Sequence, residues 1–213
     1  MSSQIDFATV AIEFVVLIVS LSIHEAAHAW TADRLGDPTA RRLGRLSLNP
    51  LVHLDPLGTV VLPLIAAVSR LPIIGWAKPV PVDPRNFREP RRDFAIVAAA
   101  GPISNLIQAV VAAAAFRAVS ASLSQDVTDV PVVMKLLYYA VSINVLLALF
   151  NLVPVPPLDG GNVLAGLLPP NAASVFIQLR RYGFLILYAL MLTGVLSAII
   201  TPPASALLGI LLP

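Results

Sequence analysis

The chain has 213 residues, of which 57% are hydrophobic and only 12% are charged, whereas soluble domains carry about 25% charged residues. This composition excludes an ordinary soluble protein and predicts a membrane protein, with residues 1–213 forming a single domain. The absence of cysteine excludes disulfides and thiolate metal ligands, so any metal site must use His, Asp or Glu. The net charge of +2 gives no reason to expect a nucleic-acid partner.

Four segments are long and apolar enough to cross a membrane, because a spanning helix needs about 20 mostly apolar residues and at least about 17. In chain order they are residues 7–23, 94–116, 132–150 and 183–200. We therefore predict an all-α multi-pass membrane protein with about four spanning helices. The apolar segment 57–69 is shorter, and we expect it to be re-entrant, although its composition leaves a full crossing open.

A stretch marked by prolines at positions 79, 81 and 84 lies between the first two spanning segments. Proline at alternate positions forbids a helix and favours an extended chain or an edge strand. We therefore predict a short extended or β loop at residues 75–86. The alternative is a loop that is merely anchored at the membrane interface by Trp76 and Lys78.

The first apolar segment ends in the sequence His24-Glu25-Ala-Ala-His28. Residues four apart share one face of a helix, so both imidazoles can reach one zinc ion, with Glu25 beside them as a general base. A five-residue pattern can arise by chance, but this one holds two of only three histidines in the chain. Ionisable groups inside a bilayer are costly and mark functional sites. The pattern therefore predicts one zinc ion per chain.

A zinc peptidase needs a third protein ligand and an open fourth position. The best candidate is Asp159, which follows segment 132–150 in the sequence Asn151-Leu-Val-Pro-Val-Pro-Pro-Leu-Asp159-Gly-Gly. The prolines must end the helix, and the glycines permit a sharp turn. The residues alone leave open that Asp159 only caps the next turn. His53, in a loop beside Asp55, is a weaker candidate for the third ligand.

The two motifs, in this order, resemble those of the site-2 protease family of intramembrane zinc metalloproteases. The resemblance implies that Asp159 is the third zinc ligand beside His24 and His28. It also implies that Asn151 helps to hold the substrate or to polarise its carbonyl group.

The resemblance covers most of residues 7–165, which we expect to form the catalytic core, with a further C-terminal helix at 183–200. The stretch Ala100-Gly-Pro-Ile-Ser-Asn105 resembles the middle core helix of the family. Like Asn144, Asn105 lies inside an apolar segment, where polar groups commonly hydrogen-bond between helices. Residues 75–86 resemble the membrane-associated loop of the family. We expect no regulatory PDZ or CBS domain within residues 1–213.

The predicted ligands must lie at one membrane depth to share an ion. An even number of crossings must therefore separate His28 from Asp159, and segments 94–116 and 132–150 supply two. If 57–69 does not cross, only Arg117 and Lys135 of the fourteen basic residues lie away from the metal side, and positive charge marks the cytoplasmic side. We therefore predict a cell-membrane protein with its N-terminus outside and its active site toward the cytoplasm.

Together these features predict a zinc metalloendopeptidase that cleaves transmembrane segments of membrane-anchored proteins, as in regulated intramembrane proteolysis. The expected partners are the lipid bilayer and a membrane-anchored substrate, either a transmembrane helix or a remnant signal peptide, while the oligomeric state stays open. The alternative is a non-catalytic ion-binding transporter or scaffold, which would not require the intact Glu25. A membrane di-iron oxidase would need more His and Glu ligands than three histidines allow.

Overall fold

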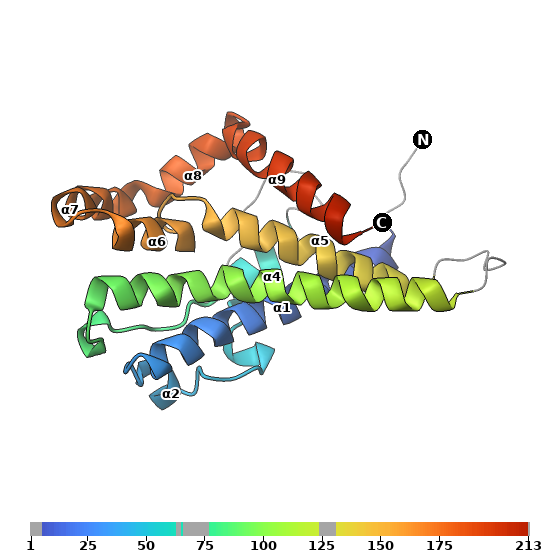
Figure 1. Cartoon of the computed structure of the whole chain (residues 1–213), viewed down its shortest axis with the longest axis horizontal. Helices are drawn as coiled ribbons and strands as arrows, with labels where there is room; N and C mark the ends of the chain where they lie inside the picture. The colour runs from blue at the N-terminus through green and yellow to red at the C-terminus, as the bar shows by residue number, and fades with distance from the viewer. Residues whose placement is uncertain (1–5, 63–64, 66–76, 124–130, 213) are drawn as a thin grey trace.

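The computed structural model describes residues 6–62, 65, 77–123 and 131–212 (Figure 1). Its longer helices are α1 (Phe7–Arg34), α4 (Pro90–Ser122), α5 (Val132–Leu152) and α9 (Val195–Leu211). The shorter ones are α2 (Thr39–Arg42), α6 (Asp159–Leu167), α7 (Pro170–Gln178) and α8 (Gly183–Leu192), with 3-10 turns η1 (Pro50–Val52), η3 (Pro84–Asn86) and η4 (Leu179–Tyr182) and a π-helical turn η2 (Pro56–Val61). Every regular element in these ranges is helical, which confirms the predicted all-α class.

Among the described residues, four helical runs are long and apolar enough to span a membrane, as the sequence predicts. Three of them are α1, α4 and α5, and the fourth is the run Pro170–Leu192, which comprises α7, η4 and α8. The fourth run differs from the predicted helix at 183–200, because the chain turns at Gly194 between α8 and α9. Gly194 has a φ of +76°, a left-handed conformation that glycine adopts without the steric cost of a Cβ.

The centre of the fold is α4, which packs against α1, α5 and α6. Figure 1 shows α1 and α5 running along α4, with α6 and α7 at one end and α8 and α9 arched over α5. Small side chains of α4 meet branched side chains of α5 and an alanine of α9, in a buried cluster of Ala109, Ala112, Ala113, Val141, Val145 and Ala204. In a membrane the hydrophobic effect does not drive helices together, and association depends on close packing, which small residues permit. This cluster therefore holds the bundle together.

Two predictions about the first half of the chain are not supported. The described start of segment 57–69 is helical through Leu62, and the rest of the expected re-entrant segment, apart from Ile65, lies outside the described residues. No strand occurs in the described part of the 75–86 loop, which runs without regular structure over residues 77–83 and then enters η3.

Local bonding explains the missing strand. The prolines supply no N–H groups, and three of the other N–H groups of the loop are bound by side chains or by a carbonyl. The N–H of Lys78 donates to the His53 carbonyl, that of Val80 to Glu25 and that of Asp83 to Asp37. The loop is therefore fastened to α1 and its surroundings instead of pairing with another strand.

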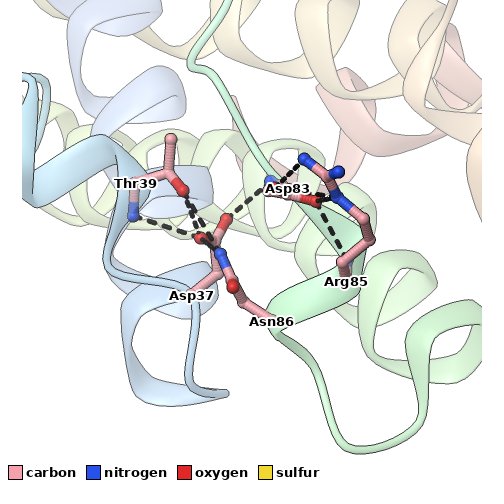
Figure 2. A network of polar contacts seen from close by, with 5 residues as sticks. All are labelled: Asp37, Thr39, Asp83, Arg85 and Asn86. Atoms are coloured by element: carbon pink, nitrogen blue, oxygen red, sulfur yellow. Dashed lines mark hydrogen bonds and ion pairs between the residues drawn. The ribbon is translucent and has the colours of Figure 1, made fainter.

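Asp37 is the main fastening point between the end of α1 and this loop (Figure 2). Its fully buried carboxylate accepts hydrogen bonds from the Asp83 N–H at 2.8 Å and the Asn86 side-chain amide at 2.7 Å, and from the N–H and hydroxyl of Thr39. Arg85 forms an ion pair with the carboxylate of Asp83 in the same loop. Asp37 therefore holds the segment that carries Val80 to Glu25.

We expect Asp37→Ala to destabilise the protein by about 1–3 kcal/mol, because donors of Thr39, Asp83 and Asn86 all lose their shared charged acceptor. The measurement is the unfolding midpoint of the purified full chain in detergent micelles. Arg85→Ala is the matched control, since it removes only an exposed ion pair of the same loop and should leave the midpoint unchanged. Equal midpoints for both variants would contradict this role of Asp37.

The same carboxylate should make stability depend on pH. Burial alone would raise the pKa of Asp37, but the hydrogen bonds from Thr39, Asp83 and Asn86 outweigh it and hold the pKa below its ordinary value of 3.8. A carboxylate with a lowered folded-state pKa stabilises fully above its unfolded pKa and loses that contribution as pH falls through the folded value. Asp37→Asn should therefore flatten the loss of stability below about pH 4.

Candidate metal centre

The histidine pair lies in the second half of α1, where the bundle buries it. His24, Glu25 and His28 are all buried, and one helical turn places the two imidazoles side by side. Their Nε2 atoms are 3.0 Å apart. The predicted pair therefore presents two ring nitrogens to one point inside the protein.

Asp159 reaches the same point from a distant part of the sequence. It is the first residue of α6, and its Oδ2 lies 3.1 Å from Nε2 of His24 and 3.4 Å from Nε2 of His28. The alternative that Asp159 only caps the next helix is not found, because α6 has no side-chain cap hydrogen bond. Gly160 permits this approach, since a Cβ there would lie 2.2 Å from the Leu152 carbonyl oxygen.

The far side of each imidazole is held by α4. Nδ1 of His28 lies 2.7 Å from the Val97 carbonyl oxygen, which can only accept, so Nδ1 carries the proton and Nε2 keeps its lone pair. Nδ1 of His24 lies 2.6 Å from Oδ1 of Asn105. Second partners of this kind fix the orientation of histidines that bind metals. The sequence pointed to Asn105 as a polar residue in an apolar segment and as part of a stretch that resembles the family, but it gave no sign of the Val97 carbonyl.

The residues fit a metal ion. Two ring nitrogens and a carboxylate oxygen converge on one point, and the buried Oδ2 of Asp159 meets only the two imidazoles. Imidazole nitrogens and carboxylate oxygens are the ligand atoms that zinc takes in proteins. Ligands held tetrahedrally at about 2.0–2.1 Å from zinc lie about 3.3 Å from one another, close to the 3.0, 3.1 and 3.4 Å measured here. His24, His28 and Asp159 could therefore hold one ion.

Gly101 leaves the space that this centre needs. A Cβ at Gly101 would lie 2.4 Å from Nε2 of His28 and 2.6 Å from Nε2 of His24. In the sequence, Gly101 was marked only by its place in the stretch that resembles the middle core helix of the family. In the structure the glycine faces the metal ligands themselves.

We expect Gly101→Ala to weaken zinc binding by at least the roughly 10–100-fold that loss of a supporting contact costs, because the methyl group displaces both imidazoles. Zinc affinity is measured by competition with a chelator. Gly209→Ala in α9 is the control, since a Cβ there meets nothing within 4 Å and alanine favours helices over glycine. Unchanged zinc affinity in Gly101→Ala would contradict the close approach of α4.

Glu25 lies beside the three-residue group but is not part of it. Its Oε2 accepts a hydrogen bond of 2.9 Å from the Val80 N–H. Arg45, also buried, donates to the carbonyl oxygens of Lys78 and Pro79 and so holds this part of the loop from the other side. The carboxylate is therefore oriented by the loop, a contact that sequence patterns did not indicate.

The other two candidate residues have backbone hydrogen-bond partners of their own. The side-chain amide of Asn151, at the end of α5, donates to the Leu147 carbonyl at 3.0 Å. His53 is buried, and its Nε2 lies 2.8 Å from the Ser47 carbonyl oxygen. His53 does not join the group formed by His24, His28 and Asp159.

A centre of two histidines and one aspartate, with a carboxylate next to it, matches the three-ligand sites of zinc peptidases. Here it lies between α1, α4 and α6, two of which are long and apolar enough to span a membrane. The fold and the site together define a metalloprotease of the membrane.

Comparisons with known proteins agree with this class. The sequence profile described as "Peptidase family M50" matches residues 118–193, a range that includes Asn151 and Asp159. A putative zinc metalloprotease, YwhC from Bacillus subtilis, is 37% identical over 90% of this chain and 85% of its own length. The putative zinc metalloproteases Rip2 of Mycolicibacterium smegmatis and of Mycobacterium tuberculosis H37Rv are 32% and 28% identical, each over 84% of this chain.

The chain therefore belongs to peptidase family M50, the site-2 protease family, and is a zinc metalloprotease. It spans 66% of the length of the Rip2 relatives. No solved structure matches it.

Proposed function

We propose that this protein hydrolyses peptide bonds within or next to the transmembrane segments of membrane-anchored proteins, with residues 1–213 acting as one domain. In this proposal His24, His28 and Asp159 hold one zinc ion. The observation that supports it most is the depth of the centre in the bundle. Asn105, which supports His24, lies fifteen residues into α4, about 22 Å along the helix from its first residue.

The roles of the side chains follow from their chemistry. Bound zinc supplies Lewis acidity, which lowers the pKa of water to about 7. Glu25 accepts the proton of the attacking water and later delivers it to the leaving amine. Asn151 holds the carbonyl group of the substrate through the second N–H of its amide, since the first donates to the Leu147 carbonyl.

The substrate must lose helical structure before it is cut, because helix carbonyls are already hydrogen-bonded along the helix. Unpaired backbone groups are costly in a bilayer, so unwinding is easiest at helix ends or near helix-breaking residues. The proposed substrate class is therefore a transmembrane helix or a remnant signal peptide with a locally weak helix. Regulated intramembrane proteolysis would be the physiological setting.

The test uses the full chain in liposomes with a single-span reporter whose transmembrane segment carries a helix-breaking residue. Mass spectrometry should place the cut within or next to the segment, and chelation of zinc should abolish it. An unfolded soluble protein serves as the comparison substrate. Equal cleavage of that protein, with cuts in the reporter confined to its soluble part, would overturn the proposal.

The proposed orientation places the metal side in the cytoplasm and the N-terminus outside. Because the chain lacks cysteine, single cysteines can report on it. Phe7 and Leu43 are both exposed; Phe7 is the first residue of α1, and Leu43 follows its other end. A membrane-impermeant thiol reagent applied to intact cells should label Phe7→Cys and not Leu43→Cys, and the reverse pattern would invert the orientation.

A further inference from the structure

We propose that Asn105 and Asn144 are positioning residues that fix His24 in the form that binds metal, through a chain of hydrogen bonds that ends at the Ala140 carbonyl. This inference rests on the proposed function, in which Nε2 of His24 is a zinc ligand. It assigns roles to two polar residues in the middle of apolar helices.

The chain of contacts crosses three helices. Nδ1 of His24 in α1 lies 2.6 Å from Oδ1 of Asn105 in α4. Nδ2 of Asn105 donates to Oδ1 of Asn144 in α5 at 2.8 Å. Nδ2 of Asn144 donates to the Ala140 carbonyl and to the Ser20 hydroxyl oxygen, both at 2.9 Å.

Every residue in this hydrogen-bond chain is buried. Asn105 is 0% exposed, and Asn144 and Ser20 are each 2% exposed. In such a dry site each polar group must use a protein partner, because leaving one unpaired is costly. A fully satisfied buried network also specifies a single arrangement of its members.

The orientation of the amides in this hydrogen-bond chain follows from its last acceptor. A backbone carbonyl cannot donate, so the Ala140 oxygen must face the NH₂ group of Asn144. The oxygen of Asn144 then faces α4, where only the NH₂ group of Asn105 can donate to it. The oxygen of Asn105 in turn faces His24, whose Nδ1 must carry the proton.

The consequence is a defined tautomer at the metal centre. A neutral imidazole has one protonated nitrogen and one lone pair, so a proton on Nδ1 leaves the lone pair on Nε2, which faces Asp159. His28 reaches the same form directly, through the Val97 carbonyl. For both imidazoles, a backbone carbonyl that can only accept thus fixes the tautomer with its lone pair on Nε2. For His24 the effect passes through two amides.

Interhelical packing alone would not produce this result. An asparagine pair that only joined α4 to α5 could adopt either amide orientation. The reversed chain would place the oxygen of Asn144 against the Ala140 carbonyl oxygen and the NH₂ group of Asn105 against His24. The proton would then move to Nε2, which could no longer bind an ion.

The direct test is the ¹⁵N spectrum of the imidazole rings in the metal-free full chain, recorded at alkaline pH so that the rings are neutral. The chain has only three histidines, so single substitutions assign the signals. We expect a protonated Nδ1 and an unprotonated Nε2 for His24 in the unsubstituted protein. The opposite tautomer would overturn the proposal without the need for any variant.

Variants then separate positioning from packing. Asn144→Leu should convert His24 to a mixture of tautomers and weaken zinc binding about 10–100-fold, the usual cost of losing a supporting residue. The ¹⁵N signals of His28 should stay unchanged, since the Val97 carbonyl fixes its tautomer independently. Asn144→Asp should restore both readouts, because a carboxyl oxygen still accepts from the NH₂ group of Asn105 in either protonation state and so keeps the oxygen of Asn105 toward His24.

Ser20→Ala is the matched control, since the Ala140 carbonyl alone still orients Asn144. It should leave the His24 tautomer and zinc affinity unchanged. An unaltered tautomer and zinc affinity in Asn144→Leu would overturn the proposal. If both readouts change as expected while no protein substrate is ever cut, the proposed protease function fails and the positioning role stands.

Discussion

Glu25→Gln is expected to retain zinc and the fold but to lose about 10²–10⁴-fold in peptide hydrolysis, the usual contribution of a general base. The amide has the size of the carboxylate and still offers an oxygen to the Val80 N–H, which binds Oε2 of Glu25 at 2.9 Å. It cannot accept a proton from water at neutral pH. The substitution therefore separates proton transfer from metal binding and from the position of the loop.

The measurements are zinc content and the turnover of the reporter in liposomes. Glu89→Gln makes the same chemical change at an exposed position, where the carboxylate pairs with Arg92, and should leave turnover unchanged. A fully zinc-loaded Glu25→Gln protein with near-normal turnover would remove Glu25 from the mechanism.

Local patterns predicted much of the fold and the histidine pair. Length and hydropathy suffice for α1, α4 and α5, because a bilayer sets the number of apolar residues that a helix must carry. The spacing of His24 and His28 directly encodes a shared helix face. The structure also brings Asp159 to them, as the count of membrane crossings required.

Hydropathy could not place the ends of the fourth apolar run. The apolar run continues to residue 200, whereas the helix stops before Gly194. The positive φ of Gly194 does not change the mean hydropathy of the run, so hydropathy cannot reveal it. The predicted strand at 75–86 failed for a similar reason. Prolines describe what a backbone cannot form, while Glu25, Asp37 and the His53 carbonyl decide where its remaining N–H groups bind.

The supporting contacts of the metal centre were hidden because they depend on three-dimensional proximity. Gly101 and the Val97 carbonyl lie on α4, some seventy residues from the histidines that they contact. A backbone carbonyl has no sequence signature. Asn105 and Asn144 were visible as polar residues in apolar segments, but the direction of their hydrogen bonds required the Ala140 carbonyl.

Asp159→Ala is expected to weaken zinc binding by more than the roughly 10–100-fold cost of losing a supporting residue, because it removes the only anionic member of the His24, His28 and Asp159 group. Zinc at 1,000 times its Kd should stabilise the unsubstituted protein by about 4.1 kcal/mol. Most of this stabilisation should vanish in the variant at the same zinc concentration. Equilibrium competition with a chelator and unfolding midpoints with and without zinc measure the two effects.

A comparison of Asp159 with His53 provides a sharper test of the same centre. Oδ2 of Asp159 lies 3.1 and 3.4 Å from the Nε2 atoms of His24 and His28. His53→Ala is the comparison, since His53 binds the Ser47 carbonyl and should keep its zinc. Full zinc retention in Asp159→Ala, together with loss in His53→Ala, would show that His53 and not Asp159 completes the metal site.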